Sequence, residues 1–200
     1  MYADDTYLTY AGDCVDSLQL YLNLDLENVH NWLRANKLTL NMTKTEFMLI
    51  GSRQRLGTLT DSPTITINDN QVSQVTTAKS LGVTIDNKLD WSSHIDKLTK
   101  KVASGIGAIK RRRHLVPQAT LHLIYQALIQ PHDYCNVVWG NCGITLLNKK
   151  QKLQNRAAHV LTYSNYDADV GHLFELLEWK NLASQQQIQR AKESLSLCTI

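Results

Sequence analysis

Two adjacent carboxylates, Asp4 and Asp5, follow Tyr2-Ala3 at the start of the 200-residue chain. Neighbouring aspartates in a tight turn repel each other unless a cation offsets their charge. Carboxylate oxygens suit Mg²⁺, which keeps several waters and shares the rest of its shell with substrate phosphates. The pair therefore predicts a magnesium site, and a carboxylate pair in an ordinary surface turn is the alternative on these residues alone.

The elements that would position this pair follow directly. Residues 6–11 alternate in the manner of a β-strand. From Val15 to Ala35, leucines recur at helical spacing and predict an amphipathic helix, with Asn36 as a left-handed stop. Residues 45–50 predict another strand, which Gly51 ends. This order places the aspartates before a strand and a long helix.

The next segments favour β structure around polar turns. Residues 51–62 are polar and predict an exposed loop, and residues 64–76 predict a β-hairpin that turns at Asn68-Asp69-Asn70. Residues 79–86 predict a further strand, in which Gly82 would allow a close backbone approach. The strands and the long helix together form a mixed α/β segment that ends near residue 88.

After Asp90 the apolar period becomes helical. Helices are predicted at 95–109, 117–131, 146–161, 173–177 and 188–197. In the second of them, Leu128 is expected on the buried side and Pro131 at the end. The chain is therefore predicted to be an α+β protein, with a mixed region over residues 1–88 and a helical region over residues 89–200.

The amino-acid composition limits the class of protein to which the chain can belong. A hydrophobic content of 43% and a charged content of 20% are typical of globular chains. The four cysteines form no CxxC pair, which favours reduced thiols over a zinc site. Neither a membrane-length apolar run nor a signal peptide is found, so we expect an intracellular protein, nuclear or cytoplasmic, with no membrane partner.

The net charge of +3 is small, so any binding of a polyanion must come from local charge. Lys97, Lys100 and Lys101 fall on one face of a predicted helix, where they favour contact with phosphates over a merely solvated face. The cluster Arg111-Arg112-Arg113 fits phosphate contact and a basic import signal equally well. The tryptophans Trp91, Trp139 and Trp179 are predicted to be core residues, and Tyr134 is expected to pack with Trp139.

Several short sequence motifs follow one another along the chain in an order that is typical of one protein family. They are Tyr2-Ala3-Asp4-Asp5, residues 38–45 (LTLNMTKT), residues 80–83 (SLGV), Leu89-Asp90-Trp91, residues 134–140 (YCNVVWG) and residues 152–158 (KLQNRAA). Together they resemble the reverse transcriptases, or RNA-directed DNA polymerases, of non-LTR retrotransposons of the jockey and CR1 kind. The resemblance covers nearly the whole chain.

The resemblance implies roles for particular residues. Asp4 and Asp5 match motif C, which holds catalytic Mg²⁺, and Tyr2 would lie beside the primer end. Lys44 matches the motif D lysine, which can protonate the leaving pyrophosphate, and an exposed strand-edge lysine is the alternative. The family's primer grip matches Leu81, Gly82 and Val83. A glycine in a tight turn is the alternative reading of Gly82.

The resemblance also implies an architecture and partners. Residues 1–88 would be a partial polymerase palm, made of antiparallel strands and one long helix. Residues 89–200 would be a helical thumb along a duplex of RNA template and DNA primer, with deoxynucleotides as substrates. The family's third metal carboxylate, its motif B and its fingers precede motif C. We therefore expect Mg²⁺ to bind weakly and the isolated chain to be inactive. The alternative is a non-catalytic remnant that binds nucleic acid.

Overall fold

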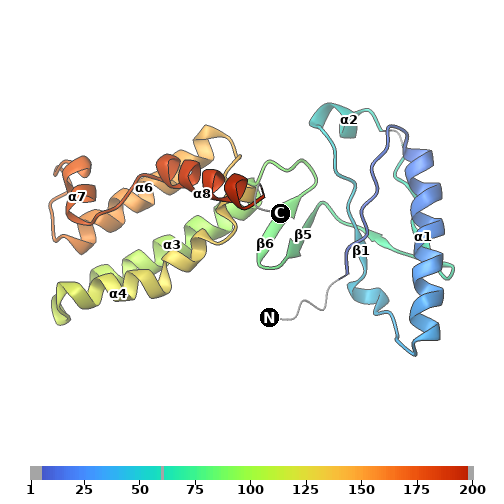
Figure 1. Ribbon diagram of the computed structural model, residues 1–200, viewed down its shortest axis with the longest axis horizontal. Helices are drawn as coiled ribbons and strands as arrows, with labels where there is room; N and C mark the ends of the chain where they lie inside the picture. The colour runs from blue at the N-terminus through green and yellow to red at the C-terminus, as the bar shows by residue number, and fades with distance from the viewer. Residues whose placement is uncertain (1–5, 60, 198–200) are drawn as a thin grey trace. The chain divides into compact units, whose positions relative to one another are not determined.

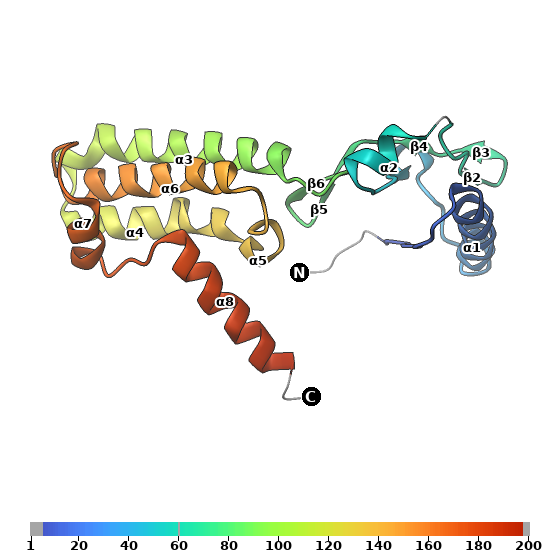
Figure 2. The same ribbon diagram turned by 90° about the horizontal axis from the view of Figure 1, so that it is seen from above.

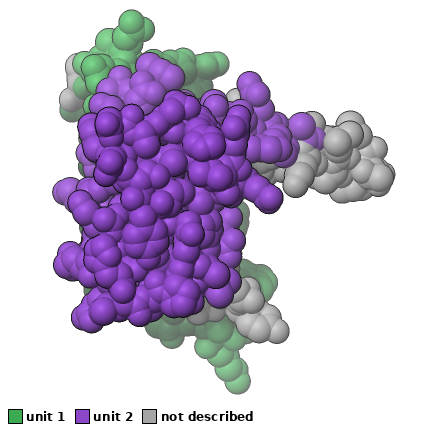
Figure 3. All heavy atoms as spheres, turned by 90° about the vertical axis from the view of Figure 1, so that its left-hand side faces the viewer, with its two compact units in different colours: residues 1–89 green, residues 90–200 purple. Residues whose placement is uncertain are grey.

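The computed structural model describes residues 6–59 and 61–197. The chain divides into two compact units, residues 1–89 (the N-terminal unit) and residues 90–200 (the C-terminal unit), which Figure 3 colours separately. Small sheets beside one long helix make up the first, and helices make up the second (Figure 1). The chain is therefore α+β. Whether the units correspond to a palm and a thumb stays a prediction.

The N-terminal unit is built around the predicted long helix, α1 (Val15–Ala35). Its inner face contributes Leu22 and Leu26 to a small core around Ile65, Ile67 and Val72. No side chain of α1 is buried, and the apolar residues Leu20, Tyr21, Leu24 and Trp32 are exposed. The helix therefore packs through one stripe and leaves a second apolar stripe uncovered by the described residues.

The predicted left-handed stop of α1 is wrong by one residue. Asn36 has a φ of −91°, whereas Lys37 has a φ of 56°. The amide of Lys37 donates to the Arg34 carbonyl and the amide of Leu38 donates to the Leu33 carbonyl, at 3.0 and 2.9 Å. This bond pattern puts the left-handed residue one position after the helix cap, so it falls on the lysine.

Three two-stranded sheets follow. In the first, β2 (Thr66–Ile67) and β3 (Asn70–Gln71) form the predicted antiparallel hairpin, with positive φ at Asn68 and Asp69. In the second, β1 (Glu46–Phe47) pairs in parallel with β4 (Ser73–Gln74), although antiparallel strands were expected. The predicted strand over 45–50 is thus reduced to two residues.

Three other strand and loop predictions are wrong. Residues 6–11 form no strand, since no strand of the described residues pairs with them. The predicted loop contains a short helix, α2 (Arg53–Gly57), because the Ser52 hydroxyl accepts from the Arg55 amide at 3.2 Å and caps it. Residues 79–86 form no single strand, because the chain turns at Leu81-Gly82 between β5 (Thr77–Ser80) and β6 (Val83–Asp86).

The C-terminal unit is a layered helical bundle. Its three main helices are α3 (Ser92–Arg112), α4 (Gln118–Leu128) and α6 (Ile144–Leu161). In Figure 2 they lie side by side, with α3 and α6 running in one direction and α4 in the other. Ile95, Ile106, Leu121 and Leu161 are almost completely buried between them. A β-carbon at Gly105 would lie 3.3 Å from Ile129, so glycine permits the close approach of α3 to the end of α4.

Shorter elements complete this unit. They are the 3₁₀ turns η2 (Arg113–Leu115) and η3 (Gln130–Asp133), and the helices α5 (Asn136–Trp139), α7 (Val170–Leu176) and α8 (Leu182–Leu197); a further 3₁₀ turn, η1 (Met42–Lys44), belongs to the N-terminal unit. Pro117 precedes α4 and Pro131 follows it, as predicted. Leu128 is 58% exposed, so its predicted burial is wrong. Within residues 6–59 and 61–197, no helix is long and apolar enough to cross a membrane.

Candidate nucleic-acid interface

The proposed magnesium ligands Asp4 and Asp5, together with Tyr2, lie outside the described residues. Within the described part of the chain, no group of three or more His, Cys, Asp or Glu side chains could hold a metal ion. The magnesium site therefore stays a prediction from the sequence.

Lys44 ends η1 and is exposed. The turn is held from within, because the Thr45 hydroxyl donates to the Asn41 carbonyl at 2.9 Å and the Thr43 hydroxyl donates to the Asn41 side chain at 2.7 Å. The backbone around Lys44 is thus fixed while its ammonium is open to solvent. This geometry is compatible with a proton donor and with an exposed edge lysine.

The three predicted primer-grip residues lie at the tip of the β5–β6 hairpin. Both turn residues have positive φ, 45° at Leu81 and 89° at Gly82. A β-carbon at Gly82 would meet no atom within 4 Å, so glycine is needed here for its backbone angle rather than for space. Leu81 is exposed and Val83 is buried, so the tip presents backbone and a leucine to solvent.

The charge of the chain is unevenly divided. Residues 90–200 contain 14 Lys and Arg against 8 Asp and Glu, a formal charge of +6, whereas residues 1–89 contain 7 against 10, a formal charge of −3. Lys97, Lys100 and Lys101 are all exposed on α3, opposite its buried stripe. The predicted lysine face therefore exists, and it belongs to the basic unit.

A second basic row lies on α6, and the sequence reasoning missed it. Lys149, Lys152 and Arg156 are exposed and are spaced three and four residues apart, so they share one face. Lys149 contacts Asp96 of α3 through an ion pair of 3.0 Å, with both side chains half exposed. The two rows thus lie on two helices that pack against each other, and together they are called here the α3–α6 basic surface. The spacing alone could have revealed the second row.

The three arginines at the end of α3 differ from one another. Arg111 and Arg112 are exposed in the last turn, where positive charge is favoured by the helix dipole. Arg113 is half-buried, with its guanidinium 5.3 Å from the centre of the Tyr163 ring. The Tyr163 hydroxyl donates to the Arg113 carbonyl. Arg113 therefore joins α3 to the segment after α6, and only the first two arginines are fully available to a phosphate.

A buried cation lies beneath the bundle surface. Lys150 is 6% exposed, forms an ion pair with Asp133, and lies with its ammonium 4.3 Å from the centre of the Trp139 ring. Burial lowers the pKa of Lys150, and the Asp133 carboxylate acts in the opposite direction. Burial also lowers the pKa of His94, and the charges of Lys97, Lys150 and Lys101 add to that effect. The interior of this unit thus resists further positive charge.

The aromatic predictions are confirmed only in part. Trp139 is fully buried, Trp91 is nearly so, and Trp179 stacks on Tyr125 with ring centres 4.7 Å apart. Tyr134 is 59% exposed, so its predicted packing is wrong, and it contributes its carbonyl, which accepts from the Trp139 indole at 2.9 Å. The described cysteines, Cys14, Cys135 and Cys142, are free thiols.

Comparison with known proteins identifies relatives of one kind. Two are Drosophila melanogaster proteins, the probable RNA-directed DNA polymerases from transposon X-element and transposon BS. Each is 25% identical to the chain, and the matches cover 80% and 82% of the chain respectively. A third is a retrovirus-related Pol polyprotein from the type-1 retrotransposable element R1 2 of Nasonia vitripennis, 24% identical over 69% of the chain.

The chain is homologous to the reverse transcriptases of non-LTR retrotransposons. It spans 18% of the length of each Drosophila polymerase and 35% of the Nasonia polyprotein. No family model and no solved structure matches it. The resemblance noted in the sequence is thus confirmed by these retrotransposon polymerases, whereas the roles of individual residues remain predictions.

Proposed function

We propose that the chain is a part of a retrotransposon RNA-directed DNA polymerase and that its C-terminal unit holds the template–primer duplex. The observation that carries this proposal is the α3–α6 basic surface, which lies on a unit of charge +6 in a chain homologous to such polymerases. Lys97, Lys100 and Lys101 would contact phosphates of one strand. Each contact would release condensed counterions, so binding would weaken steeply as salt rises.

In the same proposal the N-terminal unit carries the catalytic residues. Asp4 and Asp5 offer carboxylate oxygens, the donor type that Mg²⁺ prefers, so the residues present fit that ion. When bound, Mg²⁺ would supply charge stabilisation for phosphoryl transfer. Lys44 would give a proton to the leaving pyrophosphate, and the Leu81-Gly82 turn would bring the backbone against the primer.

The duplex-binding part is tested by the salt dependence of affinity. In the triple variant Lys97→Gln, Lys100→Gln, Lys101→Gln, the negative slope of log K against log salt should become shallower, by about 1 for each phosphate that is no longer neutralised. A matched control replaces three exposed cations of the N-terminal unit, Lys37, Arg53 and Lys88, by Gln. An unchanged slope in the first variant, or an equal decrease in the control, would refute the assignment.

The alternative is a non-catalytic protein that only binds nucleic acid. It is favoured by the location of the basic surface on the unit that lacks the proposed metal ligands. A Mg²⁺-dependent primer-extension assay on the 200-residue chain tests the alternative. Extension that disappears in Asp4→Ala would refute the alternative and the expected inactivity of the isolated chain, whereas duplex binding without extension is the result expected of the isolated chain.

A further inference from the structure

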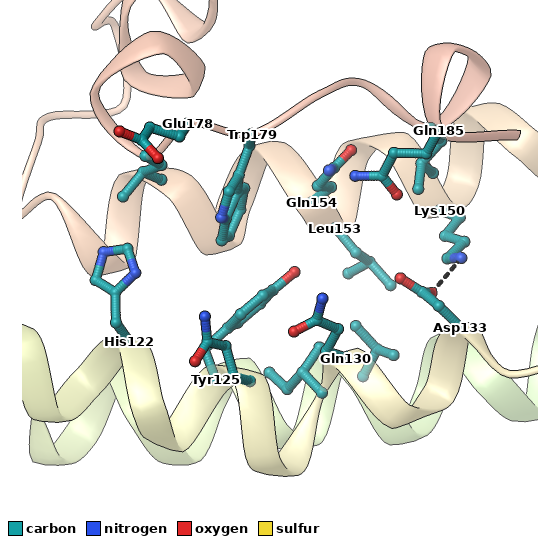
Figure 4. Close-up of a pocket in the computed structure, with 15 residues that line it drawn as sticks. His122, Tyr125, Gln130, Asp133, Lys150, Leu153, Gln154, Glu178, Trp179 and Gln185 are labelled. Atoms are coloured by element: carbon teal, nitrogen blue, oxygen red, sulfur yellow. Dashed lines mark ion pairs between the residues drawn. The ribbon is translucent and has the colours of Figure 1, made fainter. Parts of the chain in front are cut away.

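A cavity of about 360 Å³ lies inside the C-terminal unit, among α4, η3, α6 and the segment that leads into α8 (Figure 4). This volume falls within the range of small-molecule sites. Apolar side chains from three segments, Val102, Ile129 and Leu153, form part of its wall. Leu177 and Leu182 add to this apolar part, and the other lining side chains are polar or aromatic, so the cavity combines an apolar surface with groups that can orient a ligand.

The charges that line the cavity disfavour an anionic ligand. At one end the Lys150 ammonium is already occupied by its ion pair with Asp133 and by the Trp139 ring. At the other end Glu178 stands near His122 and adds a negative charge (Figure 4). A phosphate would lose its hydration without gaining a free cation, so a neutral ligand is favoured.

A hydrogen-bonding group points into the space between these ends. Tyr125 stacks on Trp179, with an angle of 29° between the rings, and Phe174 meets Trp179 edge-on. The Tyr125 hydroxyl extends into the cavity in Figure 4, and no described residue forms a hydrogen bond with it. Tyr125 is half-buried, so its hydroxyl gains free energy from a hydrogen-bond partner, which a ligand could provide.

The amides of the wall fall into two groups. The side-chain amides of Gln154 and Gln185 both donate to the Lys180 carbonyl, at 3.0 and 2.8 Å, so they are held in place. Gln126 and Gln130 line the cavity from α4 and η3 and are exposed. A glutamine amide presents a donor and an acceptor side by side, which is the pattern that matches the edge of a nucleobase.

We propose that this cavity binds a nucleobase, with its edge on the Gln126 and Gln130 amides and the Tyr125 hydroxyl and its body against the apolar wall. The ligand could be a free nucleoside or an unpaired base of a strand, which share this chemistry. The inference goes beyond the polymerase proposal, because it requires neither Mg²⁺ nor a duplex on the α3–α6 basic surface.

Titration of the 200-residue chain with adenosine and uridine, at concentrations up to millimolar, tests the proposal. Gln126→Trp should fill the cavity and abolish binding. Leu123→Trp, on the same helix but exposed and outside the cavity, should leave it intact. Tyr125→Phe keeps the aromatic stack and removes one neutral hydrogen bond, so binding should weaken about five-fold.

Further titrations distinguish the sources. A single-stranded oligonucleotide that displaces the nucleoside, where its abasic counterpart does not, assigns the cavity to an unpaired base; nucleoside binding without such displacement assigns it to free nucleosides. If neither nucleoside nor single strand binds in a way that depends on Gln126, the proposal is overturned. Duplex affinity and its salt slope should be the same in Gln126→Trp, so failure here would leave the duplex proposal standing.

Discussion

The two units differ in how much apolar surface each buries within itself. Among the described residues, the N-terminal unit buries 4 hydrophobic side chains and the C-terminal unit buries 18. The first has pairs of strands only two to four residues long and a 21-residue helix with no buried side chain. The second closes its core with helices that satisfy their own backbone. Stability should therefore be concentrated in residues 90–200.

Two tryptophans make this difference measurable. Trp139 is fully buried in the C-terminal unit, so Trp139→Ala should lower the free energy of unfolding by about 3–5 kcal/mol. Trp32 is 60% exposed on α1, so Trp32→Ala should change it by less than about 0.5 kcal/mol. Chemical denaturation of both variants provides the comparison. Equal destabilisation would show that α1 is as firmly packed as the bundle.

The buried ion pair is expected to have the next largest effect. Asp133→Asn leaves the Lys150 ammonium buried without its partner, so unfolding should become easier by about 2–4 kcal/mol. Replacing both partners, with Lys150→Met and Asp133→Leu, should recover most of that stability. A double variant that is less stable than Asp133→Asn would mean that the pair itself stabilises the unit.

A smaller effect should follow from His94. Because its pKa in the folded chain lies below the usual 6.5, unfolding favours its protonation. The contribution of His94 to stability should therefore be constant above pH 6.5 and fall as the pH decreases from 6.5 towards the lowered folded pKa. The dependence of unfolding on pH should flatten in His94→Gln and persist in the control His172→Gln, at an exposed site. A pH slope unchanged by His94→Gln contradicts this assignment.

The difference between the long helices and the short strands also explains which elements could be predicted from the sequence. Helical periodicity is local and recurs over several turns, so α1, α3 and α6 could be located with boundaries close to the observed ones. The strands could not, because a two-residue strand such as β1 is determined by a partner 27 residues away in sequence. Leu81 was missed as a turn residue, since leucine seldom adopts positive φ.

The candidate site shows the same division. The α3 lysines could be grouped by spacing within one helix, but the packing of α3 against α6, where Asp96 meets Lys149, depends on the whole bundle and is contained in no local pattern. Likewise, the walls of the cavity come from five separate segments of the chain, and Gln126 and Gln130 carry no signal by themselves. A group of site residues within one helix could therefore be predicted from the sequence. A group drawn from several elements could not, because it depends on the tertiary packing.

Hydrogen exchange of backbone amides in the 200-residue chain tests the central claim most directly. We predict that amides in the middle of α3 and α6 exchange only through global unfolding of the C-terminal unit, whereas amides in the middle of α1 exchange orders of magnitude faster through local opening. Protection of α1 equal to that of α3 would contradict the concentration of stability in residues 90–200.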